Sequence, residues 1–354
     1  MYKFKGTAEY ERNVRMIDEM AELKGKIVLG SSWALAAMFG RGETKQQVLE
    51  KQESNSPVFF AQNYLSEWVG SVENALVNIG DVLDLRTIAN PVNEVKSKED
   101  REIYLSMDVA RSSKDSASQS SIAVLEVKRN KKMKISRIRL INLINLEKGL
   151  SFERQTVDLK RLKHKYDAKM IIIDGNTLGA GIIDEALKEH ADPITGESLG
   201  CWDTVNTDQK PHEEDAEKII YDLKAQGVNN DIIINFIDMI EGKKLLLLEK
   251  KQDAGYDVKD QETYKKEILP HLQVDFLIEE IANLKLKQLS SGKLGIERVT
   301  RRLDKDRFSA VAYGCYYIMK FEDDYQEEAQ DNIRDFIMFS DSKNKRRGRR
   351  FTVV

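Results

Sequence analysis

The sequence predicts an α/β fold in which a mixed central β-sheet is flanked by helices. Three apolar segments, residues 103–109, 121–127 and 133–146, follow one another with short polar stretches between them, which is typical of consecutive strands. A helical pattern then begins near residue 151, and the continuous apolar run 170–173 comes next. Such an uninterrupted run is typical of a central strand that is covered on both faces. Strands followed by alternating helix and strand therefore indicate an α/β domain.

The individual elements follow from local patterns. Arg137 and Arg139 alternate with Ile138 and Leu140, so the third strand is expected to expose one face. Ser151 is a good N-cap, and the helix that it starts carries its apolar residues on one stripe. Further helices are predicted over residues 179–189, 230–241, 276–289 and 307–321, with a short strand over 202–205 and a hairpin near 290–300.

The chain is predicted to contain three parts. Residues 90–101 hold Pro91 and a run of charged side chains, which is typical of a linker. We therefore expect a small, mostly helical segment over residues 1–95 and the α/β domain over residues 96–325. Residues 326–354 are expected to form a flexible basic tail, because six Lys and Arg residues crowd between positions 343 and 350.

Composition indicates a soluble chain and gives no direct sign of its partner. The net charge is −3 over 354 residues, so any contact with nucleic acid must come from local basic clusters. Cys201 and Cys315 are far apart in the sequence and are expected to be free thiols. The first residues lack the apolar run of a signal peptide, and no apolar run is long enough to span a bilayer. We therefore expect no membrane partner.

Three aspartates stand at the ends of predicted elements. Asp108 ends the first strand of the domain, Asp174 ends the buried strand, and Asp306 begins the last helix. Strands that end side by side would bring Asp108 and Asp174 together, and like charges repel there unless a cation lies between them. Hard cations such as Mg²⁺ and Mn²⁺ prefer oxygen ligands. Each aspartate alone is explained equally well as a cap, so the hypothesis of a two-metal site rests on their joint placement.

Three motifs around these aspartates resemble one known family. The segment 104–112, YLSMDVARS, resembles the first catalytic strand in the nuclease domain of tailed-bacteriophage large terminases. The segment 171–184, IIIDGNTLGAGIID, is closer still to the second motif of that family, and the segment 304–314, DKDRFSAVAYG, is similar to the third. The resemblance covers about residues 103–321 and implies a ribonuclease H-like mixed sheet.

The resemblance also implies a function. It implies a metal-dependent endonuclease that cuts concatemeric double-stranded DNA with two Mg²⁺ or Mn²⁺ ions. Asp108, Asp174 and Asp306 would be its catalytic metal ligands, with Asp304 and Asp115 as candidate accessory ligands. Many relatives carry a histidine or a second aspartate just before the third acid. Asp304 and Lys305 stand there in this chain, which leaves the auxiliary group open.

The implied partners belong to a viral DNA-packaging machine. They are double-stranded viral DNA, a small terminase subunit, a portal protein and a motor ATPase, in the cytoplasm of the infected bacterial host. The segment 56–71, SPVFFAQNYLSEWVGS, resembles the end of the terminase motor domain. The phosphate-binding pattern Gly-x-x-x-x-Gly-Lys-Ser/Thr does not occur in the sequence. Residues 1–95 are therefore expected to be a remnant of that motor with its linker, and no ATP hydrolysis is expected from this chain alone.

Two groups of basic residues are candidates for contact with DNA phosphates. The first group lies on the third strand and the turn before it: Lys131, Lys132, Lys134, Arg137 and Arg139. The second group flanks the third acid: Arg301, Arg302, Lys305 and Arg307. A solvated charged face is the alternative for either group.

Two other functions stay open from the sequence. Another nuclease of the same fold, such as a resolvase or a transposase-like enzyme, would carry similar acids and would prefer branched DNA. A non-catalytic module of the packaging assembly would keep the fold and would fail to nick plasmid DNA in the presence of Mn²⁺.

Overall fold

The centre of the protein is an eight-stranded β-sheet. The computed structural model describes residues 32–54, 60, 63–65, 74–96, 99, 101–110, 119–176, 178–251, 261–289, 292–300 and 303–321. The strands are β1 (Arg86–Ile88), β2 (Glu102–Asp108), β3 (Ser121–Arg129), β4 (Ile135–Asn145), β5 (Met170–Asp174), β6 (Trp202–Thr204), β7 (Glu217–Leu223) and β8 (Leu245–Leu248). Their order across the sheet is β1-β8-β4-β3-β2-β5-β7-β6, and β3 alone runs antiparallel to its neighbours. The mixed sheet that the sequence predicts is therefore confirmed.

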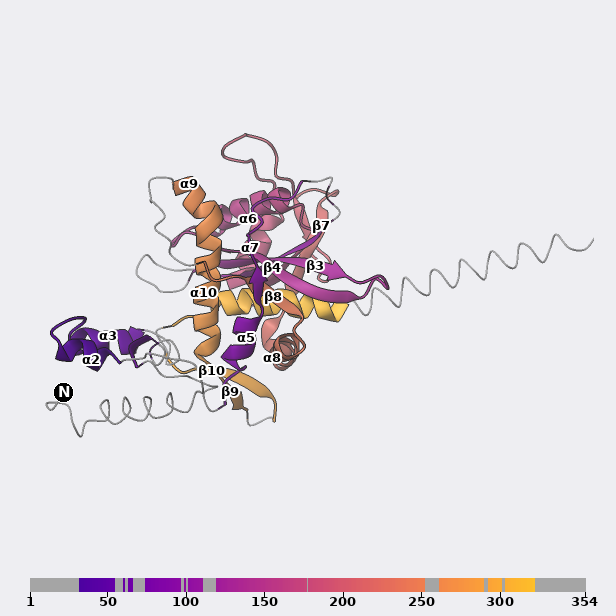
Figure 1. The fold of residues 1–354 in the computed structure, drawn as a ribbon. Coiled ribbons are helices and arrows are strands. Elements are labelled where there is room, and N and C mark those ends of the chain that lie inside the picture. The colour runs from indigo at the N-terminus through magenta and orange to yellow at the C-terminus, as the bar shows by residue number, and fades with distance from the viewer. Residues whose placement is uncertain are drawn as a thin grey trace, which may run out of the picture.

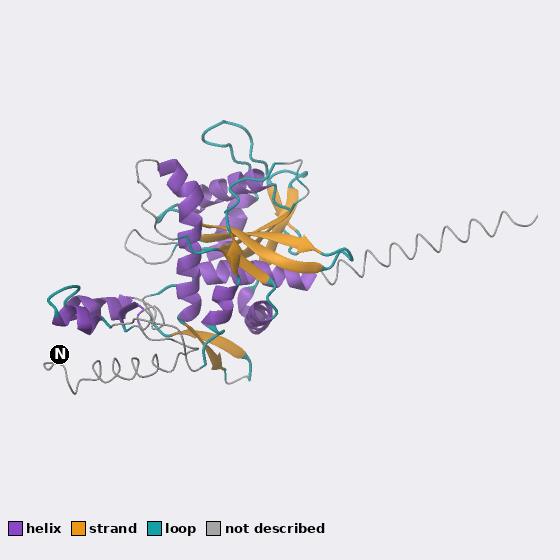
Figure 2. Ribbon diagram, in the orientation of Figure 1, coloured by secondary structure: helices purple, strands orange, loops and turns teal. Residues whose placement is uncertain are grey.

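Helices cover both faces of this sheet (Figures 1 and 2). One face is covered by α6 (Phe152–Tyr166) and α7 (Leu178–Ala186). The other face is covered by α5 (Ile79–Asp84), α8 (Ala225–Glu241), α10 (Leu269–Ala282) and a helix over residues 306–321, drawn yellow in Figure 1. A one-turn α9 (Gln261–Thr263) and a π-helical stretch (Tyr264–Ile268) precede α10. The shorter α2 (Trp33–Met38) and α3 (Lys45–Ser54) lie apart from the sheet.

Alternation along the central strands separates two apolar cores. Ile103, Leu105 and Met107 of β2 point to the α6–α7 face, and Tyr104 packs against the opposite core. On β5, Ile171 and Ile173 face α6 and α7, while Ile172 faces the other side. Because successive side chains point to opposite faces of a strand, Asp108 and Asp174 lie on the face that the 306–321 helix covers.

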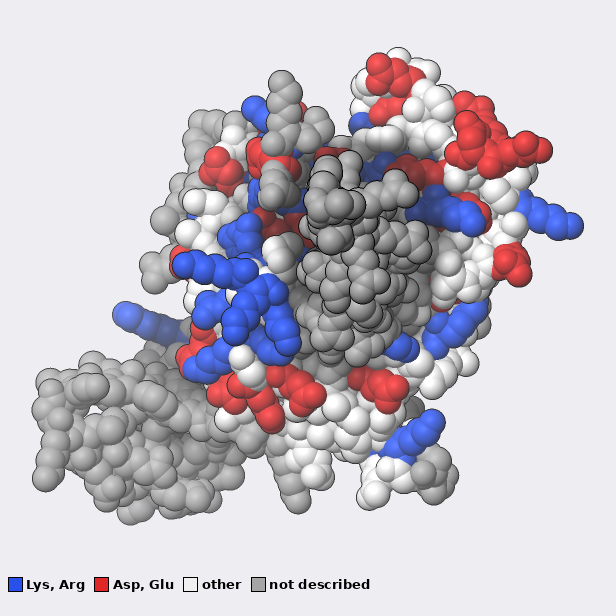
Figure 3. All heavy atoms as spheres, turned by 90° about the vertical axis from the view of Figure 1, so that its right-hand side faces the viewer, with Lys and Arg blue, Asp and Glu red and all other residues white. Residues whose placement is uncertain are grey.

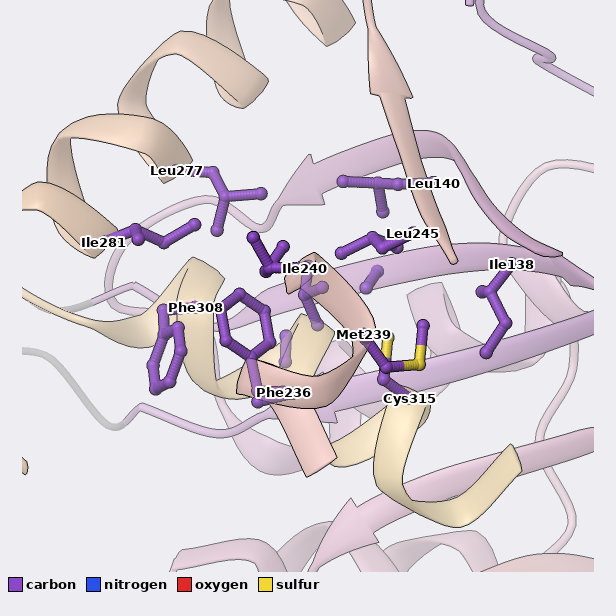
Figure 4. Packing of buried hydrophobic residues seen from close by; sticks show 14 of the residues in the cluster. Ile138, Leu140, Phe236, Met239, Ile240, Leu245, Leu277, Ile281, Phe308 and Cys315 are labelled. Atoms are coloured by element: carbon purple, nitrogen blue, oxygen red, sulfur yellow. The ribbon is translucent and has the colours of Figure 1, made fainter. Parts of the chain in front are cut away.

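The core on that face unites segments that are distant in the sequence. Figure 4 shows Phe236, Met239 and Ile240 of α8 packed between the strand residues Leu140 and Leu245 and the helix residues Leu277, Ile281 and Phe308. Leu76, Val77, Ile79 and Val82 belong to the same core, and β1 pairs with β8. Residues 76–88 are thus packed into the α/β unit, so packing is continuous across the position where the sequence places the domain boundary.

The predicted helix over residues 276–289 is wrong at its carboxyl end. The helix ends at Ala282, and β9 (Leu284–Gln288) pairs with β10 (Leu294–Arg298) in an antiparallel hairpin. Asn283 fixes this change, because its side-chain amide donates to the Thr300 carbonyl at 2.9 Å and accepts from the Thr300 amide at 2.7 Å. The residues that follow alternate between apolar and charged, a strand pattern that the helical interpretation overlooked.

Between the helices predicted after residue 179, the sequence analysis expects only the short strand over 202–205 and the hairpin near 290–300, and the structure adds further strands there. β7 and β8 both join the central sheet, β7 beside β5 and β8 beside β4. The other predicted elements are present within a few residues. Cys201 and Cys315 are buried free thiols, as expected. The predicted tail over residues 326–354, together with Asp115, Arg301 and Arg302, lies outside the described residues. Within the described part of the chain, every helix is too short or too polar to span a membrane.

One buried carboxylate holds the middle strands together. The Glu126 side chain on β3 is fully buried and pairs with Arg101 at 2.7 Å, Lys128 at 2.7 Å and Arg139 at 2.6 Å. Burial alone would raise the pKa of Glu126, but the hydrogen bonds from Arg101 and Lys128 outweigh it and hold this pKa below the ordinary 4.5. The pairing therefore stabilises the fold at neutral pH.

We predict that Glu126→Ala lowers the free energy of unfolding by about 3 kcal/mol, because one carboxylate holds three cations in a buried setting. Urea denaturation at pH 7 measures this. Glu297→Ala is the control, since Glu297 and Lys287 form an exposed pair at 3.6 Å that should contribute less than about 1 kcal/mol. Because the folded pKa of Glu126 is lowered, its contribution is complete above about pH 4.5. The difference between wild type and Glu126→Ala should shrink as the pH falls through that lowered pKa, and an unchanged difference at pH 3 would contradict the assignment.

Candidate active site

Asp108 and Asp174 end neighbouring strands at the same edge of the sheet. β2 and β5 are parallel, and their last registered pair is Met107 with Ile173, so the two aspartates follow it side by side. Alternation then sends both side chains to the face covered by the 306–321 helix. The predicted meeting of these two carboxylates is thus a consequence of strand direction and register.

Asp306 joins them because its helix lies very close to the sheet. Asp306 is the first residue of the 306–321 helix. Gly314 of that helix faces β2 and β3: a Cβ there would collide with the Leu125 side chain and would lie 2.8 Å from the Cβ of Ser106. The missing side chain lets the helix backbone approach the strands, which brings the helix start to the strand ends.

The pKa of Asp108 reflects the closeness of these acids. The pKa of Asp108 is raised to about 7, chiefly by burial; the charges of Asp306 and Asp174 contribute to this rise, while Lys305 and a hydrogen bond from Ser309 act against it. The pKa of Asp306 is also raised, first by burial, although the Gln119 amide stabilises its charged form. Without a counter-ion, the charges of Asp174 and Asp306 therefore oppose the ionisation of Asp108.

Backbone and side-chain donors orient two of these carboxylates. Asp174 Oδ1 accepts hydrogen bonds from the Asn176 amide at 3.2 Å, from Asn176 Nδ2 at 2.7 Å and from the Ala225 amide at 3.1 Å. No described residue donates to its Oδ2. Asp306 Oδ2 accepts from the Gln119 amide at 3.0 Å. Within the described part of the chain, each of these two carboxylates thus accepts hydrogen bonds at one oxygen only.

The first two turns of the 306–321 helix supply donors around Asp108. Lys305 Nζ donates to Ser309 Oγ at 2.9 Å, and the Ser309 side chain is hydrogen-bonded to Asp108. Tyr313 is buried one turn further on. Burial and the neighbouring charges of Asp108 and Asp174 raise the pKa of its phenol, so the hydroxyl stays protonated and is available to donate.

The donor set fits a hard divalent cation. All three converging groups are carboxylates, and oxygen is the ligand that Mg²⁺ and Mn²⁺ prefer. A cation among them would offset the repulsion that, together with burial, raises the pKa of Asp108. As they stand, no three His, Cys, Asp or Glu side chains within the described ranges have the spacing to hold one ion together.

The Gly-x-Gly pattern after Asp174 serves packing. A Cβ at Gly179 would strike the Asp174 carbonyl, and a Cβ at Gly181 would lie 2.5 Å from the Phe152 ring. These two glycines let α7 begin directly beneath the end of β5 while it packs against α6. A cavity of about 570 Å³ between α6 and residues 192–199 lies on this α6 side, away from the carboxylates.

The predicted accessory and basic residues near the third acid separate into different settings. Asp304 forms an ion pair with Arg298 at 3.4 Å and raises the pKa of Asp306 through its charge. Lys305 lies among the carboxylates. Arg307 is held by the buried Glu280 at 2.6 Å and Gln273 at 2.7 Å, with its guanidinium over the Phe276 ring. The charge of Arg307 is thus used inside the fold.

The other predicted basic group lies at the opposite end of the sheet. Ser121 pairs with Asp108, and β3 runs from there to Arg129, so the β3–β4 turn is roughly 25 Å from Asp108 at about 3.3 Å per residue. Lys131, Lys132, Lys134 and Arg137 are exposed there, whereas Arg139 is bound to Glu126. Figure 3 looks onto the end of the molecule toward which this hairpin points, and basic side chains gather there beside acidic ones.

Several residues at the site were not identified from the sequence. Ser309 is hydrogen-bonded to Asp108, and the charges of the acids act on Tyr313. Both residues follow Asp306, at intervals of three and seven, which places them on one helix face. Asn176 stands two residues after Asp174, a spacing typical of an Asx turn, and this signal was available. Gln119 and Ala225 donate through their backbone amides, so their residue types carry no signal.

Comparison with known proteins finds structural neighbours only. No family model matches the chain, and no curated protein matches it. The large terminase nuclease of thermophilic phage G20c with bound magnesium is similar at 15% identity and TM-score 0.41, covering 69% of this chain and 97% of that one. The Thermus phage P74-26 large terminase nuclease domain is similar at 14% identity and TM-score 0.39, covering 68% of this chain and 94% of that one. The HK97 bacteriophage large terminase is similar at 10% identity and TM-score 0.39, covering 87% of this chain and 59% of that one. None of these likenesses assigns a role to a residue of this chain.

We predict that Gly314→Ala destabilises the fold by about 1–3 kcal/mol, since the added methyl group must push the 306–321 helix away from β2 and β3. Chemical denaturation measures the loss. Gly227→Ala in α8 is the matched control, because a Cβ there meets nothing within 4 Å and alanine favours a helix by up to about 1 kcal/mol. Equal stability of the two variants would show that the helix does not depend on close approach at Gly314.

Proposed function

We propose that this chain is a metal-dependent endonuclease of the terminase type, with a ribonuclease H-like fold. The observation that carries the proposal is the convergence of Asp108, Asp174 and Asp306, from two parallel strand ends and one helix start, on one face of the sheet. Burying like charges together costs free energy in the absence of a cation. A site of this kind is therefore best explained by the binding of divalent metal ions.

The chemistry would be hydrolysis of a phosphodiester bond in double-stranded DNA. Two Mg²⁺ or Mn²⁺ ions, when bound, supply activation of the attacking water and stabilisation of the departing oxygen. Asp108, Asp174 and Asp306 would hold the ions, with Asp304 as an accessory whose charge already acts on Asp306. Tyr313, protonated and buried beside Asp108 and Asp174, would donate a hydrogen bond within the site.

The structural neighbours agree in kind with this proposal, since they are large terminases or their nuclease domains, one of them with bound magnesium. Lys305 is the basic residue best placed for the phosphate that is cut, because it already lies among the acids. The exposed residues Lys131, Lys132, Lys134 and Arg137 would contact a distant part of the duplex or an acidic partner. A motor ATPase, a small terminase subunit and a portal protein are the proposed partners of the complete machine.

Cleavage of supercoiled plasmid in Mn²⁺ tests the function directly. We predict that the wild-type chain nicks or linearises plasmid and that EDTA abolishes the reaction. Asp108→Asn and Asp174→Asn should each lower the rate at least about 10³-fold, because each removes a charge that the metal ions require. Asp158→Asn is the control: Asp158 is also a half-buried aspartate whose pKa is raised by burial, but it lies on α6.

Two outcomes would redirect the assignment. Full activity of Asp108→Asn would show that the three acids are not the catalytic centre. A wild-type chain that binds Mn²⁺ but leaves every DNA intact would favour the non-catalytic packaging module, and a strong preference for branched DNA would favour a resolvase-like nuclease.

Thermal denaturation supplies a second, activity-free prediction. Without metal, Asp108→Asn should melt at a higher temperature than the wild type, because the neutral amide removes repulsion with Asp174 and Asp306. In Mn²⁺ at 100 times its dissociation constant the wild type should gain about 2.7 kcal/mol, and Asp108→Asn should gain almost nothing. An equal gain in both proteins would place the Mn²⁺ site elsewhere.

A further inference from the structure

Residues 222–225, which span the end of β7 and the start of α8, each contact Asp174 or the turn that follows it. The Gly175 amide donates to the Leu223 carbonyl at 3.0 Å, and the Ala225 amide donates to Asp174 Oδ1 at 3.1 Å. Lys224 Nζ donates to the Gly175 carbonyl at 3.2 Å. The Asp222 carboxylate occupies the space that a Cβ at Gly175 would need. Residues 222–225 therefore fix the backbone that carries the Asp174 side chain.

Asp222 is placed there at a cost. Its side chain is 4% exposed, and its Oδ1 has no hydrogen-bond partner among the described residues. Among the described residues its single charged partner is Lys224, with 2.8 Å between Oδ2 and Nζ, and Lys224 is itself 55% exposed. A buried carboxylate with one satisfied oxygen is unfavourable for stability alone. The pair is better explained by what Lys224 reaches while Asp222 holds it, which is the Gly175 carbonyl.

Asp222 is unsuited to be a fourth ligand of the same site. In the sheet register it pairs with Ile173, whereas Asp174 pairs with Leu223. Ile173 points to the α6–α7 core and Leu223 to the opposite core, so Asp222 and Asp174 lie on opposite faces. Asp222 can act on the site through Lys224 and the Gly175 turn.

We propose that Asp222 and Lys224 are positioning residues that hold the Asp174 carboxylate in the orientation that binds a divalent cation. The inference rests on the proposed function, since it assigns a metal to Asp174. Removal of a group that orients a metal ligand without binding the metal itself typically lowers metal affinity 10- to 100-fold. Loss of the pair should therefore weaken metal binding even in the absence of DNA.

The test is Mn²⁺ binding by isothermal titration calorimetry without DNA, paired with thermal denaturation in EDTA. Lys224→Met alone would leave the Asp222 carboxylate buried without its ion-pair partner, which would destabilise the fold. The double variant Asp222→Asn, Lys224→Met removes both charges and avoids this cost. We expect its dissociation constant for Mn²⁺ to rise about 10- to 100-fold while its melting temperature in EDTA stays near that of the wild type. The single variant Lys224→Arg keeps the charge and the hydrogen-bond donors, so its affinity for Mn²⁺ should be much closer to that of the wild type than to that of the double variant.

Lys218→Met is the matched control, because Lys218 lies on β7, the strand that carries Asp222, and faces Asp203 at 4.0 Å, away from the Asp174 turn. It should bind Mn²⁺ within about 2-fold of the wild type, well below the 10-fold threshold. An equal loss in Lys218→Met would overturn the inference, since the effect would then not depend on the contacts of Asp222 and Lys224 with the turn after Asp174.

The remaining outcomes separate the inference from the function. If the wild type binds Mn²⁺ and cuts DNA while the double variant binds Mn²⁺ equally well, the inference alone fails. If the double variant loses affinity for DNA only, Lys224 contacts the duplex and the positioning role is again overturned. If the wild type binds no Mn²⁺, the proposed function fails and the inference fails with it.

Discussion

β2 and β5 run parallel and side by side, and each ends in an aspartate, so two carboxylates must share one edge of the sheet. The remaining groups of the candidate site lie around these two repelling carboxylates. The 306–321 helix adds a third carboxylate and also brings Lys305, Ser309 and Tyr313, which supply a cation and hydrogen-bond donors. Such an arrangement is poor for stability and well suited to a divalent cation.

Close packing at glycines makes this convergence possible. Gly314 admits the 306–321 helix against β2 and β3, and Gly179 admits the start of α7 against the end of β5. Gly175 leaves room for the Asp222 carboxylate. Asp222 pairs with Lys224, which donates a hydrogen bond to the Gly175 carbonyl in the turn after Asp174. At these positions a side chain would displace an element that carries or orients a catalytic candidate, so backbone proximity and chemistry are linked.

Buried carboxylates also decide which basic residues remain for a partner. Glu126 holds Arg101, Lys128 and Arg139 in the middle of the sheet, and Glu280 holds Arg307 at the start of the 306–321 helix. A cation that neutralises a buried acid loses much of its attraction for an external phosphate. The exposed basic residues of the β3–β4 turn are not neutralised in this way and can still attract a phosphate. The charge of Lys305 acts on Asp108 and Asp306.

The sequence by itself determined the mixed sheet, the strands that end in Asp108 and Asp174, and the helix that begins at Asp306. Local alternation, apolar runs and helical spacing specify these features because they depend on residues that are neighbours in the chain. Tertiary structure alone decided that β7 and β8 join the sheet, that Arg139 and Arg307 are used internally, and that residues 222–225 hold Asp174. These outcomes depend on contacts between segments tens of residues apart, whose partners are chosen by packing and by the pairing of buried charges. For the three aspartates, sequence and tertiary structure each decided a part. The sequence indicated where each aspartate lies in its strand or helix. Their convergence required the parallel register of β2 and β5 and the close approach of the 306–321 helix at Gly314.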